Sequence, residues 1–145
     1  METNLKAFEK TIEQKTKTGQ FSPQSLAYLG DAVYELYVRL QSTATPYNSV
    51  SNLHENTVRL VSAPTQAVLL DKIYPKLTKE EQAIVRRGKN AKVHQPPKGV
   101  RYYEYRLATG FEALVGYLYL KEREDRIEEL LINEVNRELS NEECK

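Results

Sequence analysis

The spacing of apolar residues along the chain indicates helices, because no segment alternates between apolar and polar residues with the two-residue period of a half-buried strand. Apolar residues instead recur every three or four positions, and short polar segments with proline or glycine separate these runs. We therefore predict an all-α fold. Its six helices are expected to cover residues 22–41, 50–61, 63–74, 78–88, 102–120 and 125–139.

Several helix ends carry recognisable signals. Ser22, followed by a proline, is typical of a helix N-terminus, and Thr78 followed three residues later by Glu81 predicts a capping box. Gly88 is expected to end the fourth helix. Residues 89–100 contain two prolines and a glycine and show no hydrophobic period, so they are predicted to form a loop.

The first helix is strongly apolar, and a helical wheel predicts which of its faces is buried. Asp31 falls nearly opposite that face, and Glu35 follows one turn later. Further apolar residues flank Asp31, so its surroundings do not resemble an ordinary solvent-facing stripe. The residues predicted to form the buried face are Leu26, Leu29, Val33, Leu36, Tyr37 and Leu40.

Acidic residues inside two apolar helices are the most informative chemical feature. Asp31 and Glu35 are the only charged residues between 26 and 38, and Glu112 is the only one between 107 and 120. Removing an ionised carboxylate from water costs several kcal/mol or more unless a cation, hydrogen-bond donors or a wet cleft lies beside it. Either these carboxylates meet and hold a metal ion, or they cap a neighbouring helix or pair with an arginine.

Length and charge narrow the picture further. At 145 residues the chain fits one domain, which we place at residues 21–145 after a polar N-terminal arm at residues 1–20. The net charge of +1 does not indicate a nucleic-acid partner, but residues 86–106 carry seven basic residues against one acid. This segment is either a solvated surface loop or an arm that contacts phosphates. The candidate phosphate contacts are Arg87, Lys89, Lys92, Lys98, Arg101 and Arg106.

Several kinds of chemistry are disfavoured by the sequence. Cys144 is the only cysteine, and His54 and His94 lie in different predicted elements without metal-ligand spacing. No phosphate-binding glycine motif or serine-nucleophile motif is present, which leaves metal chemistry with oxygen ligands. The N-terminus lacks the apolar segment of a secretory signal, and no apolar run is long enough to span a membrane, so we expect a cytoplasmic protein.

Two motifs resemble the ribonuclease III family. Residues 29–36, LGDAVYEL, are similar to the family signature, and residues 111–120, FEALVGYLYL, are similar to its second acidic motif. Between them, residues 59–62 (RLVS) and 87–89 (RGK) follow the order found in the family. The resemblance covers residues 22–138 and is closest to the mini-ribonuclease III branch, a nuclease domain without a double-stranded-RNA-binding domain.

This resemblance implies a dimeric, all-helical endoribonuclease that cuts both strands of double-stranded RNA with Mg²⁺, for which Mn²⁺ substitutes. In the mini branch the implied substrate is a precursor of the large-subunit (23S) ribosomal RNA. Asp31 and Glu112 match the family's metal-binding and catalytic acids, whereas Ala27 and Thr109 stand where larger relatives have two further acids. The number of directly bound metal ions is therefore open. An aromatic residue at Tyr28 is expected to pack across the dimer axis.

The sequence thus predicts a Mg²⁺-dependent endoribonuclease in which Asp31 and Glu112 hold the metal. Glu35 is either a helper of the metal site or a pairing partner inside the bundle. The main alternative is a non-catalytic RNA-binding or ribosome-associated protein on the same fold, and a purely helical adaptor is a third.

Overall fold

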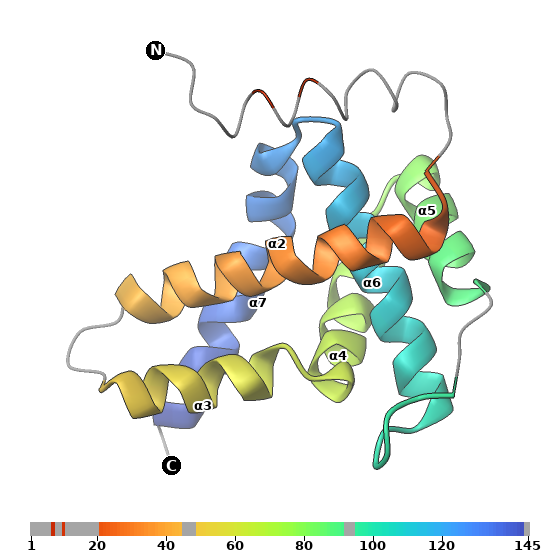
Figure 1. Ribbon diagram of the computed structural model, residues 1–145. Coiled ribbons are helices and arrows are strands. Elements are labelled where there is room, and N and C mark those ends of the chain that lie inside the picture. Colours follow the sequence, from red (N-terminus) through yellow and green to blue (C-terminus); the bar gives the residue numbers. More distant parts are fainter. Residues whose placement is uncertain (1–6, 8–9, 11–20, 45–48, 92–94, 144–145) are drawn as a thin grey trace.

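The computed structural model describes residues 7, 10, 21–44, 49–91 and 95–143. These residues form six α-helices and a short 3₁₀ helix and include no strand, so the predicted all-α fold is confirmed (Figure 1). Lys92, His94 and Cys144 lie outside the described residues, as does nearly all of the predicted N-terminal arm. The elements are α2 (Pro23–Ala44), α3 (Val50–Leu60), α4 (Ala63–Ile73), η1 (Tyr74–Lys76), α5 (Lys79–Lys89), α6 (Tyr102–Leu120) and α7 (Glu124–Glu143).

The predicted helix starts agree with the observed caps. The Ser22 hydroxyl accepts a hydrogen bond from the Ser25 amide at 3.1 Å and caps α2. At the start of α5, the Thr78 hydroxyl accepts from the Glu81 amide at 3.1 Å, and the Thr78 amide donates to the Glu81 carboxylate at 2.9 Å. This is the predicted capping box. The helix ends are less accurate, because α2 and α7 both continue beyond the predicted last residue.

Gly88 does not end α5, contrary to the prediction. The helix continues to Lys89, and Gly88 is buried where α5 packs against α6. A Cβ atom at Gly88 would lie 2.8 Å from the Cα atom of Gly110, so no larger residue fits without moving one of the helices. The glycine is therefore required by close helix packing and not by a turn.

The helix α6 lies at the centre of the molecule and contacts α2, α4, α5 and α7. Its closest approach is to α2, which crosses it in Figure 1. A Cβ atom at Gly30 would overlap the backbone carbonyl of Glu112, and one at Gly116 would overlap that of Leu26. The two backbones thus touch at this crossing, which brings the segment around Asp31 against the segment around Glu112.

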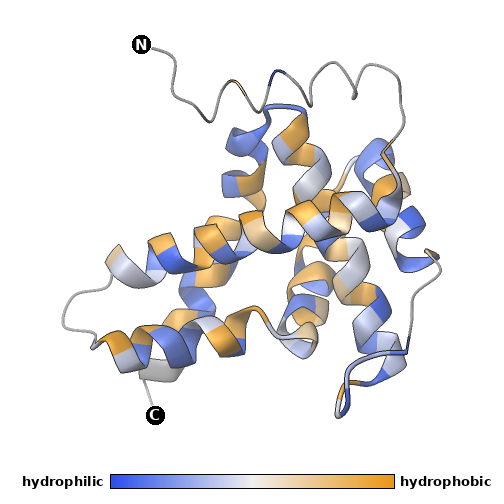
Figure 2. Cartoon of the chain, viewed as in Figure 1, coloured by the Kyte–Doolittle hydropathy of each residue, from blue (hydrophilic) through white to orange (hydrophobic). Residues whose placement is uncertain are grey.

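The predicted buried face of α2 is partly wrong. Leu36 and Leu40 are 57 % and 55 % exposed, whereas Tyr34 and Val38, which are not among the residues predicted to be buried, are fully buried. The close approach at Gly30 turns the side that contains Tyr34 and Val38 towards α6. Apolar residues consequently remain on the outer side of α2, and Figure 2 shows hydrophobic positions along its whole length.

Tyr34 shows why this face of α2 is the buried one. Its hydroxyl donates to the carbonyl oxygen of Leu60 at 2.8 Å, and its ring packs edge-on against Phe111 with 5.0 Å between ring centroids. The polar end of the side chain is therefore satisfied within the core. On α4, Ala67, Leu70 and Ile73 are buried on the inward face. No helix in the described ranges combines the length and apolar character needed to cross a bilayer.

Candidate metal centre

The structure brings Asp31 and Glu112 together at the crossing of α2 and α6. Asp31 directly follows Gly30, whose lack of a side chain allows the two helices to touch, and the carboxyl group of Glu112 shares a hydrogen bond with Asp31. Asp31 is exposed, whereas the Glu112 carboxyl group is largely buried. The pair therefore combines one acid that faces solvent with one that faces the interior.

The surroundings of Glu112 strongly favour its neutral form in the absence of a cation. Burial is the main cause and raises the pKa of Glu112 to about 9, with further contributions from the hydrogen bond to Asp31 and from the Asp31 charge. The Gln66 amide acts in the opposite direction, and no cation among the described residues contributes. Pairing with a buried arginine therefore does not explain Glu112.

Glu35 does not take part in this pair. It forms an ion pair with Arg39, one turn later on α2, with 3.2 Å between the Arg39 Nε atom and the carboxylate. Both side chains are well exposed, so this contact contributes little to stability. Of the two alternatives left open for Glu35, the structure supports a pairing partner, although at the surface and not inside the bundle.

Gln66 is a further residue at this site that the sequence interpretation missed. It lies on the inward face of α4, is only 2 % exposed, and donates from Nε2 to the carbonyl oxygen of Val61 at 3.1 Å. A polar residue one position before the inward-facing Ala67 was the signal that could have revealed it. Glu112 thus lies where side chains from α2, α4 and α6 meet.

This donor set fits Mg²⁺. A magnesium ion keeps several waters and takes one or two protein carboxylates, and Asp31 with Glu112 supplies that number of oxygen ligands. Among the described residues, no three histidine, cysteine, aspartate or glutamate side chains cluster closely enough to hold a metal by themselves. A closed structural zinc site is therefore not supported within this part of the chain.

The basic segment is divided between surface and structural roles. Arg87, Lys98 and Arg101 are exposed, as expected for phosphate contacts, and Lys89 is half-buried with its side chain against Gly110. The exposed rings of Tyr102 and Tyr103, 56 % and 65 % exposed, follow Arg101 at the start of α6. Glu112 lies further along α6, roughly 15 Å from Tyr102 along the helix axis at 1.5 Å per residue.

Arg106, also a predicted phosphate contact, makes contacts within the protein. Its Nε atom donates to the carbonyl oxygen of Lys89 at 2.8 Å, and Nη2 donates to the Asn90 side chain at 2.8 Å. The guanidinium group also lies 5.9 Å from the centre of the Tyr102 ring. Arg106 therefore ties the end of α5 to the start of α6 through two of its five N–H donors.

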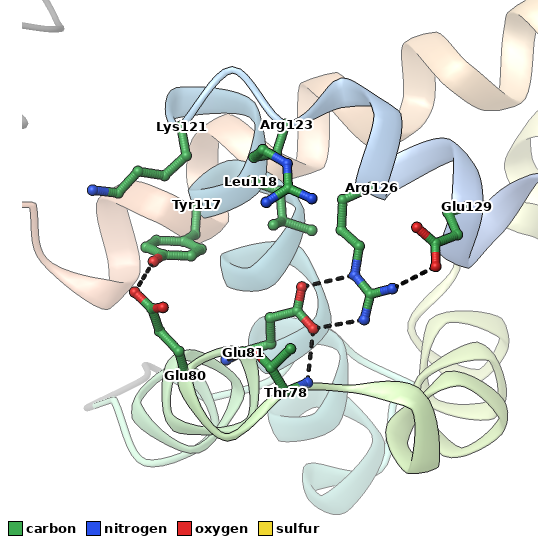
Figure 3. Close-up of a pocket in the computed structure, with 9 residues that line it drawn as sticks. All are labelled: Thr78, Glu80, Glu81, Tyr117, Leu118, Lys121, Arg123, Arg126 and Glu129. Atoms are coloured by element: carbon green, nitrogen blue, oxygen red, sulfur yellow. Dashed lines mark hydrogen bonds and ion pairs between the residues drawn. The ribbon is translucent and has the colours of Figure 1, made fainter.

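A separate cavity of about 570 Å³ lies between the start of α5, the end of α6 and the start of α7 (Figure 3). Arg126 lines it and makes two 2.9 Å hydrogen bonds to Glu81, one to Glu129 and one to the carbonyl oxygen of Lys76. Tyr117 donates to Glu80 on the other side. Neither Asp31 nor Glu112 lines this cavity, so it is distinct from the candidate metal centre.

Comparison with known proteins agrees with this geometry. The family model of the ribonuclease III domain matches residues 24–123. A crystal structure of a protein from Fusobacterium nucleatum has a TM-score of 0.72 and 32 % identity, covering 85 % of this chain and 95 % of the other. The chain belongs to the ribonuclease III family, and it is an endoribonuclease of that type.

Two curated relatives place the chain within the family. It is 46 % identical to Mini-ribonuclease 3 of Thermoanaerobacter sp. over 90 % of this chain and 94 % of the relative. It is 50 % identical to Mini-ribonuclease 3 of Symbiobacterium thermophilum over 75 % of this chain and 84 % of the relative. The predicted mini-ribonuclease III branch is thereby confirmed, which favours the enzyme over a non-catalytic RNA-binding protein or an adaptor.

Proposed function

We propose that this endoribonuclease cleaves double-stranded RNA in a Mg²⁺-dependent reaction, with Asp31 and Glu112 as the metal ligands and catalytic acids. The observation that supports this proposal is that the two carboxylates meet and that no cation from the described part of the chain accompanies them. Two carboxylates in contact repel each other when both are ionised, and a divalent cation between them removes that repulsion.

The two acids have different tasks in this proposal. Glu112 is held inside the protein and anchors the site, and its proton must leave when the cation is bound. Asp31 is exposed, and in this proposal the RNA approaches the site from its side. When bound, Mg²⁺ supplies a more acidic water as the nucleophile and offsets negative charge at the phosphate that is cut.

We further propose that Arg87, Lys89, Lys98 and Arg101, together with Lys92, contact the phosphates of the duplex. Such contacts provide affinity without base specificity, which suits an A-form duplex that proteins recognise by shape. The proposed natural substrate is a precursor of the large-subunit (23S) ribosomal RNA, as the resemblance to the mini branch implies, and the proposed location is the cytoplasm.

The proposed active form is a homodimer. Tyr28, Leu36 and Leu40 lie on the outer side of α2 and are 86 %, 57 % and 55 % exposed. A row of large apolar side chains on one exposed helix is unusual for a monomer and marks an interaction surface. Two copies related by a twofold axis would also place one metal site against each strand of a duplex.

The test is cleavage of a labelled RNA duplex, with and without Mg²⁺, by wild type, Asp31→Asn and Glu112→Gln. Each substitution removes a charge at nearly constant volume. We expect cleavage only with Mg²⁺, and a loss on the order of 10²–10³ or more in both variants, as for removal of one electrostatic group from a catalytic centre.

Circular dichroism and duplex binding are the controls, and both should match wild type. Turnover close to wild type in either folded variant would contradict the assignment. Cleavage of single-stranded RNA in preference to duplex would contradict the proposed substrate.

A further inference from the structure

Gln66 has one polar atom that nothing in the described part of the chain satisfies. The residue is 2 % exposed, and its Oε1 atom is buried without a hydrogen-bond partner among the described residues. Buried side-chain oxygens are nearly always paired with protein or with ordered water. An unpaired amide oxygen beside Glu112 therefore indicates that a further donor belongs at this site.

The orientation of the Gln66 amide follows from its neighbours. The nitrogen lies 3.1 Å from the carbonyl oxygen of Val61, and an amide oxygen turned to that position would face another acceptor. The second hydrogen of the same nitrogen remains available, and the Gln66 amide lies close enough to the Glu112 carboxyl group to lower its pKa and so favour the ionised form. The unpaired Oε1 atom is bonded to the same carbon and thus lies next to the carboxylate pair.

A second glutamine shows that the local hydrogen bond alone does not explain this arrangement. Gln82 occupies the same position in α5 as Gln66 does in α4, four residues after the N-cap. Its Nε2 atom likewise donates to the carbonyl oxygen five residues earlier, that of Leu77, at 3.4 Å. Gln82 is only half-buried and does not contribute to the Glu112 environment. Complete burial beside Glu112 is therefore specific to Gln66.

We propose that Gln66 is a positioning residue of the metal site, whose nitrogen holds the Glu112 carboxylate in place and whose Oε1 accepts a hydrogen bond from a water of the cation's hydration shell. The inference rests on the proposed function, because it requires Asp31 and Glu112 to bind the cation. Waters around a cation direct their hydrogens outward and need acceptors, and side chains of this kind tune metal sites.

The experiment measures Mn²⁺ binding by electron paramagnetic resonance, without RNA, in Gln66→Leu, Gln66→Met and the matched control Gln82→Leu. Leucine and methionine are apolar and similar in size to glutamine, and circular dichroism reports whether the two variants fold. We expect Mn²⁺ affinity to fall about 10–100-fold in the Gln66 variants and to stay at the wild-type level in Gln82→Leu. The Mg²⁺ concentration for half-maximal cleavage should rise by a similar factor.

Wild-type Mn²⁺ affinity in a folded Gln66 variant would overturn the inference, as would failure of both Gln66 variants to fold, because a positioning role predicts a folded protein. The variants Asp31→Asn and Glu112→Gln distinguish an error in the role of Gln66 from an error in the proposed function. If these two lose Mn²⁺ while the Gln66 variants bind normally, only the role of Gln66 is wrong. If these two also bind normally, the metal site itself is elsewhere.

Discussion

Glu81 is buried and Glu112 is partly buried, yet the two carboxylates have opposite surroundings. Glu81 is 5 % exposed and receives two hydrogen bonds from Arg126, which hold its pKa below the ordinary value. Glu112 faces another acid, and its pKa is raised to about 9. The first carboxylate carries its own cation and joins α5 to α7. The second receives no cation from residues 21–44, 49–91 or 95–143, as expected of a group that binds a cation from solution.

Removing the charge of Glu81 should destabilise the protein, with the largest change in the free energy of unfolding that we expect. In Glu81→Gln, Arg126 keeps its hydrogen bonds to Glu129 and Lys76 but loses its buried partner. We expect the free energy of unfolding to fall by about 3 kcal/mol, near the lower end for breaking a buried ion pair, because glutamine still completes the capping box. Urea unfolding at pH 7 measures this. An unchanged midpoint would mean that the ion pair contributes no net stability.

Removing the charge of Glu112 should have the opposite effect on the metal-free protein. Because its folded-state pKa is above the value in the unfolded chain, the stability that the neutral form provides is present below about pH 4.5 and is lost as pH rises towards 9. Glu112→Gln does not ionise and avoids this loss. We expect it to be more stable than wild type at pH 8 by on the order of 1–3 kcal/mol, and equally stable at pH 4.

Thermal unfolding with a chelator, compared between the two proteins at several pH values, tests this difference. Saturating Mg²⁺ is the control, since it should stabilise wild type and leave Glu112→Gln unaffected. A variant that is less stable than wild type at every pH would contradict the contrast between the two glutamates.

The basic residues differ in a similar way, because some are engaged within the protein and others are exposed. The expected effect of replacing the exposed ones is smaller. Arg106 and Arg126 are engaged within the protein, whereas Lys98 and Arg101 are exposed. Replacing Lys98 and Arg101 together by alanine should weaken binding to duplexes of any sequence and reduce the slope of log affinity against log salt by roughly 0.9 per lost contact, on the scale of a B-form duplex. Fluorescence anisotropy across a salt series measures the slope. An unchanged slope would identify these residues as ordinary surface charges.

Local signals in the sequence predicted much of this structure. Caps and prolines placed most helix starts because they act through neighbouring backbone groups, as at Ser22 and Thr78. Asp31 and Glu112 stood out because charges are costly in apolar helices. Their meeting in space supports that interpretation, while their roles in catalysis remain the proposal tested above.

The sequence was less informative where packing against another helix decides which residues are buried or hydrogen-bonded. A helical wheel ranks the faces of α2 by apolar content, but contact with α6 at Gly30 selected the face that contains Tyr34 and left Leu36 exposed. Arg106 was counted with the phosphate contacts because its partner, the carbonyl oxygen of Lys89, belongs to another helix. Such choices depend on contacts between distant segments and leave no local signal.

The touching backbones of α2 and α6 also keep the two acids close together in the metal-free protein. Because Gly30 and Gly116 let the helices meet without intervening side chains, Asp31 and Glu112 are held in contact by the folded core. The core therefore opposes their separation, and in the proposed mechanism the binding of a cation does not have to assemble the site. Gly30 thus helps to keep the proposed metal site assembled, although it has no side chain that could contact the cation or the RNA.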